Sequence, residues 1–328
     1  MASKDSQNVN VVSSDEEPDT GPSENQKAKE IALIDPNVID LDLNHTRIGK
    51  IEKLEALTKV ETICFRQNLI SKLEGLDTLG DTLRELDVYD NQITQIEGIQ
   101  NLVNLVLLDL SFNRIKKIEN VGDLHKIKKI FFSSNKISKI ENLDHMTELE
   151  MLELGANRIR VIENISTFTK LTELFLGKNK ITTICNLDSL VNLTILDIQS
   201  NRLLKVEGLE SLVNLEQLYL SHNGISVIEG LDKNLKLQTV DLAANRIEKI
   251  ENLNHLTELE ELWLNDNNVS QWENILHLKP LTKLETVYLE RNPIWREENN
   301  PTKINVNYRR KLMLDLPQLK QIDATYCR

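Results

Sequence analysis

The chain has 328 residues, of which 40% are apolar and only 4% aromatic, and its 51 acidic against 39 basic residues leave a formal net charge of −12. This excess of negative charge argues against a general affinity for nucleic acid or anionic membranes, because both need clustered Lys and Arg to neutralise phosphate. It favours a basic protein surface as the partner.

The first residues are expected to form a disordered tail. Residues 1–27 are rich in Ser, Asp, Glu, Asn and Pro, a composition typical of segments that bury too little apolar surface to fold. Ser13 and Ser14 precede the acidic residues 15–17, so their phosphorylation by an acidophilic kinase is a hypothesis, and a solubilising tail is the simpler alternative. Apolar residues become frequent over 28–39, which predicts an amino-terminal cap.

The cysteines and the chain start indicate the compartment. Cys64, Cys185 and Cys327 show no paired or metal-type spacing. The amino terminus has no apolar signal core, and no stretch is long enough to span a membrane. These features predict an intracellular protein of the nucleus and cytoplasm, without a metal site.

Residues 40–294 carry one short motif, Leu-x-Leu-x-x-Asn-x-Ile, that recurs mostly every 22 residues. Thr46 stands in for the asparagine in the first, degenerate copy, so the count is twelve repeats. The asparagines are Asn68, Asn91, Asn113, Asn135, Asn157, Asn179, Asn201, Asn223, Asn245, Asn267 and Asn292.

Each repeat predicts a short strand followed by a return turn. The alternation in Leu-x-Leu points the leucines inward and the residue between them outward. The asparagine amide can serve turn backbone groups that would otherwise lack partners. The following Ile-x-x-Ile-Glu and polar segment predict a helical or 3₁₀ return on the outer side. One unit has no closed core, so stacking has to supply it.

This motif is the leucine-rich-repeat signature. It predicts an α/β repeat fold: one elongated, curved solenoid, or horseshoe, with a concave parallel sheet roughly 50 Å long and short helical or 3₁₀ turns on the convex side. Residues 295–328 depart from the repeat. Their helical spacing from Tyr308 stops at Pro317, which predicts a helical carboxy-terminal cap over the last sheet edge.

The outward residues between the paired leucines form a concave column that alternates acids and aromatics from Asp109 to Trp263. The leucines pack inward, so the fold is not expected to require this alternation. Exposed aromatics flanked by charges are typical of interface hot spots. Mutual packing of the rings without a partner is the alternative. The column reads Asp42, Cys64, Asp87, Asp109, Phe131, Glu153, Phe175, Asp197, Tyr219, Asp241, Trp263 and Tyr288, with Tyr89, Glu85, Glu173, Glu261, Asn265 and Glu290 beside it.

Residues about 40 to 328 resemble the family of leucine-rich-repeat regulatory subunits of protein phosphatase 1, the regulatory subunit 7 family. The resemblance rests on the Ile-Glu-Asn and Ile-Glu-Gly-Leu repeat endings, as at 118–120 and 228–231, on the blocks at 218–225 and 285–293, and on the cap residues 308–311 and 321–325. It implies that the concave face binds the phosphatase catalytic subunit through Asp109, Phe131, Glu153, Phe175, Asp241, Glu261, Trp263 and Tyr288.

The resemblance further implies a role in phosphatase biogenesis, localisation and mitotic control. The bound enzyme would be held in a low-activity form, often with a small second inhibitor protein. Together, the column and the resemblance predict ten partner-binding residues: Asp109, Phe131, Glu153, Phe175, Asp197, Tyr219, Asp241, Glu261, Trp263 and Tyr288.

A linear docking motif is a weaker alternative. Lys129-Ile130-Phe131-Phe132 fits the basic, aliphatic, any, aromatic pattern of many phosphatase regulators, but Ile130 and Phe132 occupy inward strand positions. Exposing both would cost several kcal/mol. Docking is therefore expected to use the folded face.

Two other classes of function compete with phosphatase binding. Catalysis is not expected, because the six histidines converge on no repeat position and no phosphate-binding glycine loop, metalloprotease motif or nucleophile elbow is present. No cofactor is predicted. A leucine-rich-repeat scaffold of a splicing particle or of a cilium or microtubule assembly remains the alternative function.

Overall fold

The computed structural model describes residues 29, 31, 34–297 and 299–327. The disorder predicted for 1–27, with the phosphorylation of Ser13 and Ser14, lies outside the described residues, as do residues 28, 30, 32 and 33 of the predicted cap. The chain divides into two compact units, Met1–Arg158 and Ile159–Arg328. A single elongated domain was expected. In a repeat array each repeat packs mainly on the repeats next to it, so distant repeats share no common core.

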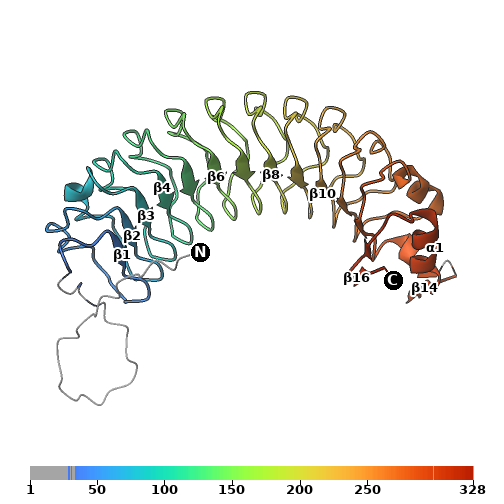
Figure 1. Ribbon diagram of the computed structural model, residues 1–328, viewed down its shortest axis with the longest axis horizontal. Coiled ribbons are helices and arrows are strands. Elements are labelled where there is room, and N and C mark those ends of the chain that lie inside the picture. Colours follow the sequence, from blue (N-terminus) through green and yellow to red (C-terminus); the bar gives the residue numbers. More distant parts are fainter. Residues whose placement is uncertain (1–28, 30, 32–33, 298, 328) are drawn as a thin grey trace, which may run out of the picture. The chain divides into compact units, whose positions relative to one another are not determined.

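The amino-terminal unit is a stack of parallel three-residue strands, which Figure 1 shows side by side with turns on either side. Each strand pairs in register with the next. The elements are β1 (Asp40–Asp42), β2 (Thr62–Cys64), η1 (Asp77–Leu79), β3 (Glu85–Asp87), β4 (Leu107–Asp109), β5 (Lys129–Phe131) and β6 (Met151–Glu153).

The carboxy-terminal unit continues the same pattern and adds a cap. Its repeat strands are β7 (Glu173–Phe175), β8 (Ile195–Asp197), β9 (Gln217–Tyr219), β10 (Thr239–Asp241), β11 (Glu261–Trp263) and β12 (Thr286–Tyr288). The remaining elements are η2 (Trp272–Leu278), η3 (Pro293–Trp295), β13 (Arg296–Glu297), β14 (Asn300–Ile304), α1 (Tyr308–Asp315), β15 (Gln321–Ile322) and β16 (Thr325–Tyr326). Within the described residues, β1 to β12 occupy the twelve predicted strand places, which confirms the leucine-rich-repeat fold.

The core of each repeat is built from the inward positions of the motif. The middle residues of β4, β5 and β6, which are Leu108, Ile130 and Leu152, are 0% exposed. Phe132 is equally buried, so Ile130 and Phe132 of the docking sequence 129–132 both lie in the core as expected. A fully buried Leu or Ile contributes about 1.5–3 kcal/mol, and stacking repeats this contribution along the chain.

The asparagine of the motif joins consecutive repeats by hydrogen bonds. The Asn113 amide donates to the carbonyl oxygens of Val88 (3.0 Å) and Leu110 (3.1 Å), and its oxygen accepts the N–H of Ile93 (2.9 Å). The same pattern recurs at Asn91, Asn135, Asn157, Asn223, Asn245 and Asn267. The predicted role of the asparagine is confirmed.

Most outer returns are separate turns rather than helices. In the described repeats, 3₁₀ helix forms at η1 and η2. Elsewhere the return is built from single hydrogen-bonded turns, as where the N–H of Leu124 donates to the carbonyl oxygen of Val121 at 3.1 Å. Asn120 enters this return with a φ of 57°, the left-handed conformation that favours Asn and Gly. Few residues remain before β5, and Val121, Leu124 and Ile127 must all point inward, so there is no room for a regular helix.

The carboxy-terminal cap contains the predicted helix, α1, which ends before Pro317. β15 adds to β12 in parallel and β16 folds back antiparallel, so the last repeat strand gains a paired neighbour. Tyr308 is 2% exposed and donates its hydroxyl to Asp323 (3.4 Å), whose carboxylate accepts the N–H groups of Leu289 and Glu290. The antiparallel pairs β13–β14 and β15–β16 were not anticipated. The expected boundaries at 28, 40 and 295 stay a prediction.

Candidate partner-binding face

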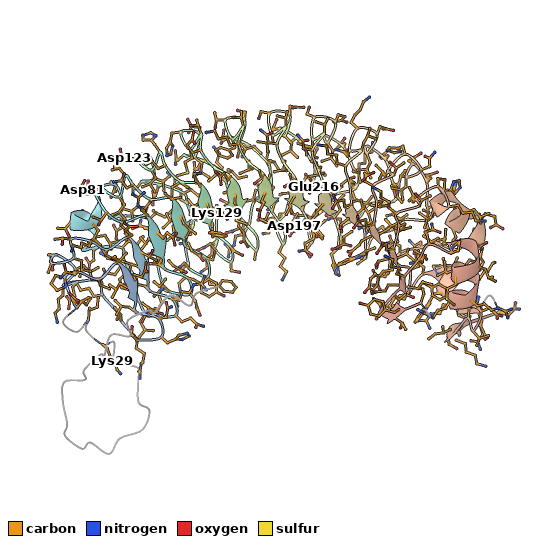
Figure 2. All side chains as sticks on the ribbon, in the orientation of Figure 1. Lys29, Asp81, Asp123, Lys129, Asp197 and Glu216 are labelled. Carbon is orange, nitrogen blue, oxygen red and sulfur yellow. The ribbon has the colours of Figure 1, made fainter. Side chains whose placement is uncertain are left out.

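The predicted site residues lie on the strand face of each unit, in neighbouring registers. In the amino-terminal unit, Asp109 pairs with Phe131 and Phe131 with Glu153. In the carboxy-terminal unit the aligned third residues of β7 to β12 are Phe175, Asp197, Tyr219, Asp241, Trp263 and Tyr288, and Glu261 lies two residues before Trp263. Figure 2 labels Asp197 on this face of its unit. The register therefore places all ten residues in these two sets of strands.

The aspartates of the column have a structural task that sequence reasoning missed. Asp109, Asp197 and Asp241 each accept the backbone N–H two residues ahead, at 2.8, 2.8 and 2.9 Å. Asp42 and Asp87 make the same bond. That N–H points away from the ladder and has no strand partner, so a carboxylate satisfies it. These acids therefore have a local structural role, although strands with Phe131, Phe175 or Tyr219 at the same position form without one.

Burial shapes the electrostatics of these carboxylates. Asp109 is 8% exposed and Asp241 only 4%. Burial raises the pKa of Asp109, Asp197 and Asp241, while the backbone hydrogen bond to each carboxylate acts in the opposite direction. A cation that approached this face would stabilise the ionised form of all three groups.

Asp241→Asn is expected to remove part of the pH dependence of stability. Because burial raises its folded-state pKa above the ordinary 3.8, the contribution of Asp241 to the free energy of unfolding falls as pH rises from 3.8 through that raised pKa. Asparagine does not titrate, and its oxygen can accept the same N–H of Ala243. The urea midpoint of the variant, measured relative to the wild type, should therefore rise from acidic to neutral pH.

The exposed Asp232 offers a matched control for this titration. Asp232→Asn should follow the wild-type pH dependence, because no buried carboxylate is lost. A midpoint difference between Asp241→Asn and the wild type that stays constant across the pH range would contradict the prediction.

The aromatic side chains of the column are held in place by neighbours. Trp263 and Tyr288 pack with ring centroids 5.6 Å apart, and the Tyr288 hydroxyl accepts the amide of Gln321 at 2.8 Å. Tyr219 donates its hydroxyl to Gln217 at 3.0 Å. In the part of the chain that the structure describes, Phe131 and Phe175 pair with no other ring. Packing between column rings therefore explains the positions of Trp263 and Tyr288, whereas Phe131 and Phe175 are half-buried without such a ring contact.

Three apolar residues on the same face were missed by sequence reasoning. Leu107 and Met151 begin β4 and β6, with Lys129 of β5 between them, and Ile195 begins β8. All three are half-buried. They precede Asp109, Glu153 and Asp197 by two residues and so share their face. The signal was available: these positions are apolar where most repeats have a polar residue, but only the acidic residues Glu85, Glu173 and Glu261 at this position were singled out.

The described residues hold no group of three or more His, Cys, Asp and Glu side chains that could bind a metal ion. Nor do they include a helix with the length and apolar character needed to cross a membrane. Burial and the neighbouring Asp87 and Asp42 carboxylates raise the pKa of the Cys64 thiol in the column to about 11, which disfavours the reactive thiolate.

The chain is similar to known leucine-rich-repeat proteins. A leucine-rich-repeat family model matches residues 99–207, and a model of two leucine-rich repeats matches 191–233, 213–255 and 235–277. Among solved structures, an internalin (inlF) of Listeria monocytogenes has a TM-score of 0.70 at 24% identity, covering 88% of each chain. The leucine-rich-repeat domain of APL1B has a TM-score of 0.65 at 20% identity, covering 94% of this chain and 89% of that one. These likenesses show the fold alone.

Curated relatives match shorter segments at higher identity. Protein phosphatase 1 regulatory subunit 7 of Xenopus tropicalis is 54% identical over 55 residues, which are 17% of this chain and 16% of the relative. Protein phosphatase 1 regulatory subunit SDS22 of Saccharomyces cerevisiae is 42% identical over 88 residues, 26% of each chain. The Arabidopsis thaliana homologue of the regulatory inhibitor subunit PPP1R7 is 37% identical over 92 residues, 28% of each chain.

In these matches the chain spans between 16% and 28% of the length of the three relatives. They confirm the resemblance that the sequence motifs indicated. The chain is therefore a leucine-rich-repeat protein, and its matched segments are similar to regulatory subunits of protein phosphatase 1.

Proposed function

We propose that this chain is a non-catalytic regulatory subunit that binds the catalytic subunit of protein phosphatase 1. The relatives named above support a regulatory role, and the strand faces supply the chemistry for binding. The observation that carries the proposal is the alternation of rings and carboxylates in register. Phe131 lies between Asp109 and Glu153 in one unit, and Tyr219 lies between Asp197 and Asp241 in the other.

The proposed contacts divide by chemistry. Phe131, Phe175, Tyr219, Trp263 and Tyr288 offer apolar anchors whose truncation commonly costs about 2 kcal/mol or more at an interface. Asp109, Glu153, Asp197, Asp241 and Glu261 meet basic side chains of the partner. The three aspartates are already oriented by backbone N–H groups, so less side-chain freedom is lost when a cation binds.

The regulatory outcome follows from the same proposal. Binding holds the phosphatase in a low-activity form, alone or with a small second inhibitor protein, and contributes to its biogenesis, its localisation and the control of mitosis. The complex would reside in the nucleus and cytoplasm. No cofactor or nucleic acid takes part in this scheme.

Trp263→Ala should weaken binding of purified phosphatase 1 catalytic subunit by at least about tenfold. The indole is a half-buried ring that packs at a tilt of 59° against Tyr288, so its removal takes away an anchor and loosens its neighbour. Isothermal titration would give the dissociation constant, and phosphatase activity read in the same mixtures would show whether the complex is silent.

Trp295→Ala is the matched control, because Trp295 lies in η3 outside the repeat strands and its ring contacts Arg296. It should bind like the wild type. Circular dichroism melting of all three proteins checks the fold. A folded wild type that does not bind the catalytic subunit would end the phosphatase assignment and leave a scaffold of another assembly.

A further inference from the structure

Beside the column, the amino-terminal unit carries a cluster of three side chains, Arg66, Tyr89 and Phe112, here called the Arg66 cluster. The Arg66 guanidinium lies over the Tyr89 ring, 4.9 Å from its centroid. The Tyr89 and Phe112 rings pack 4.8 Å apart at 45°. Three consecutive repeats therefore contribute to one continuous surface, and none of the ten predicted site residues belongs to it.

Phe112 occupies a position where a large side chain is unfavourable. Its φ is 54°, in the left-handed region, and its side chain is 46% exposed. Bulky residues are rare in this conformation, which favours Gly, Asn and Asp. The equivalent left-handed residues of the other repeats in the unit are His45, Gln67, Asp90, Ser134 and Ala156. The fold does not require phenylalanine at this position, because five other residue types occupy the equivalent positions. An exposed ring in a strained conformation points to a binding role.

The cluster is continuous with the proposed partner-binding face. The Nε atom of Arg66 donates to Asp87, and its Nη2 donates to the Asp109 carboxylate at 3.3 Å. Asp109 is one of the predicted site residues. Arg66 thus contacts two column residues, Asp87 and Asp109, and also lies over the Tyr89 ring. A partner seated on Asp109 would therefore lie against the cluster.

The charges around the cluster select the chemistry of the occupant. The Arg66 guanidinium bonds the carboxylates of Asp87 and Asp109, and two further acids of the Asp87 repeat, Glu85 and Asp90, add negative charge to this part of the unit. Glu85 and Asp90 are exposed. A basic side chain can meet these exposed carboxylates while an adjacent apolar side chain packs on the two rings.

We propose that the Arg66 cluster is an additional docking patch for the phosphatase catalytic subunit, which receives a segment with a basic residue next to an apolar one. This inference rests on the proposed function. It adds Tyr89 and Phe112 as apolar anchors, and Arg66, which bonds Asp109 and lies over Tyr89, joins these anchors to the column.

Phe112→Asn tests the patch without threatening the fold, because asparagine tolerates the left-handed conformation better than phenylalanine does. Ser134→Asn is the matched control at the equivalent position of the next repeat, where φ is 56°. Both variants should melt no lower than the wild type. In titrations with purified catalytic subunit, Phe112→Asn should raise the dissociation constant about tenfold, and Ser134→Asn should leave it unchanged.

Each outcome of these titrations supports or overturns the docking patch. Phe112→Asn binding as tightly as a binding wild type would overturn the patch and leave the proposed function standing. Equal weakening by both variants would also overturn it, since the loop position rather than the ring would then matter. No binding by the folded wild type would remove the proposed function and the patch together.

Discussion

Asn113→Ala is expected to lower the free energy of unfolding by about 2–4 kcal/mol, since each buried polar group left without a partner costs about 1–3 kcal/mol. The variant loses the bonds to the carbonyl oxygens of Val88 and Leu110 and to the N–H of Ile93. These groups lie inside the stack, where water cannot replace the amide. Urea unfolding followed by circular dichroism would measure the loss, and hydrogen exchange would locate it in the repeats of β3 and β4.

An exposed asparagine of the same unit provides the control. Asn101 lies on the outer return and donates to Asp77 at 3.3 Å. Asn101→Ala should change the free energy of unfolding by less than about 0.5 kcal/mol, as for most surface substitutions. If the two variants unfolded at the same urea concentration, the asparagine ladder would not carry the stability assigned to it.

Gly98→Ala is the second substitution with a large expected effect, a loss of at least about 2 kcal/mol. Gly98 has a φ of 69°, and a Cβ atom there would lie 2.0 Å from the carbonyl oxygen of Leu73. The left-handed conformation alone costs alanine roughly 1–2 kcal/mol, and the clash with a backbone atom of the neighbouring repeat adds to it. The midpoint of urea unfolding would report the loss.

Gly122→Ala is the matched control in the same unit, because a Cβ atom there meets no heavy atom within 4 Å. It should unfold within about 0.5 kcal/mol of the wild type. Similar midpoints for Gly98→Ala and Gly122→Ala would show that the repeats can move apart at the Leu73 carbonyl, against the close stacking described above.

Much of the fold could be predicted because its information is local and repeated. The paired leucines and the asparagine recur with a fixed spacing, so that each copy confirms the reading of the others. The strand places, the inward core and the asparagine bonds follow from this pattern. The helix that begins at Tyr308 was marked by its apolar spacing and by Pro317.

Other features depend on how the chain packs in three dimensions. The outer returns were expected to be helical or 3₁₀, and among the described repeats 3₁₀ helix forms at η1 and η2. Elsewhere the few residues of a return, as between Asn120 and β5, must turn three side chains inward. The column aspartates were predicted to bind a partner, and only the structure shows that Asp109, Asp197 and Asp241 each also accept a backbone N–H that has no partner in the neighbouring strand. A composition pattern identifies such residues without showing what already occupies them.

By itself, the sequence determined the repeat, the direction of each side chain in a strand and the column of acids and rings, because a period of two within the strand and of 22 between strands specifies all three. Only the tertiary structure decided which of those side chains are buried, bonded or available. Arg66 reaches Asp109 across 43 residues of sequence, and Tyr89 meets Phe112 on the next repeat. Such contacts depend on side-chain conformation and on the register between repeats, which no single repeat encodes.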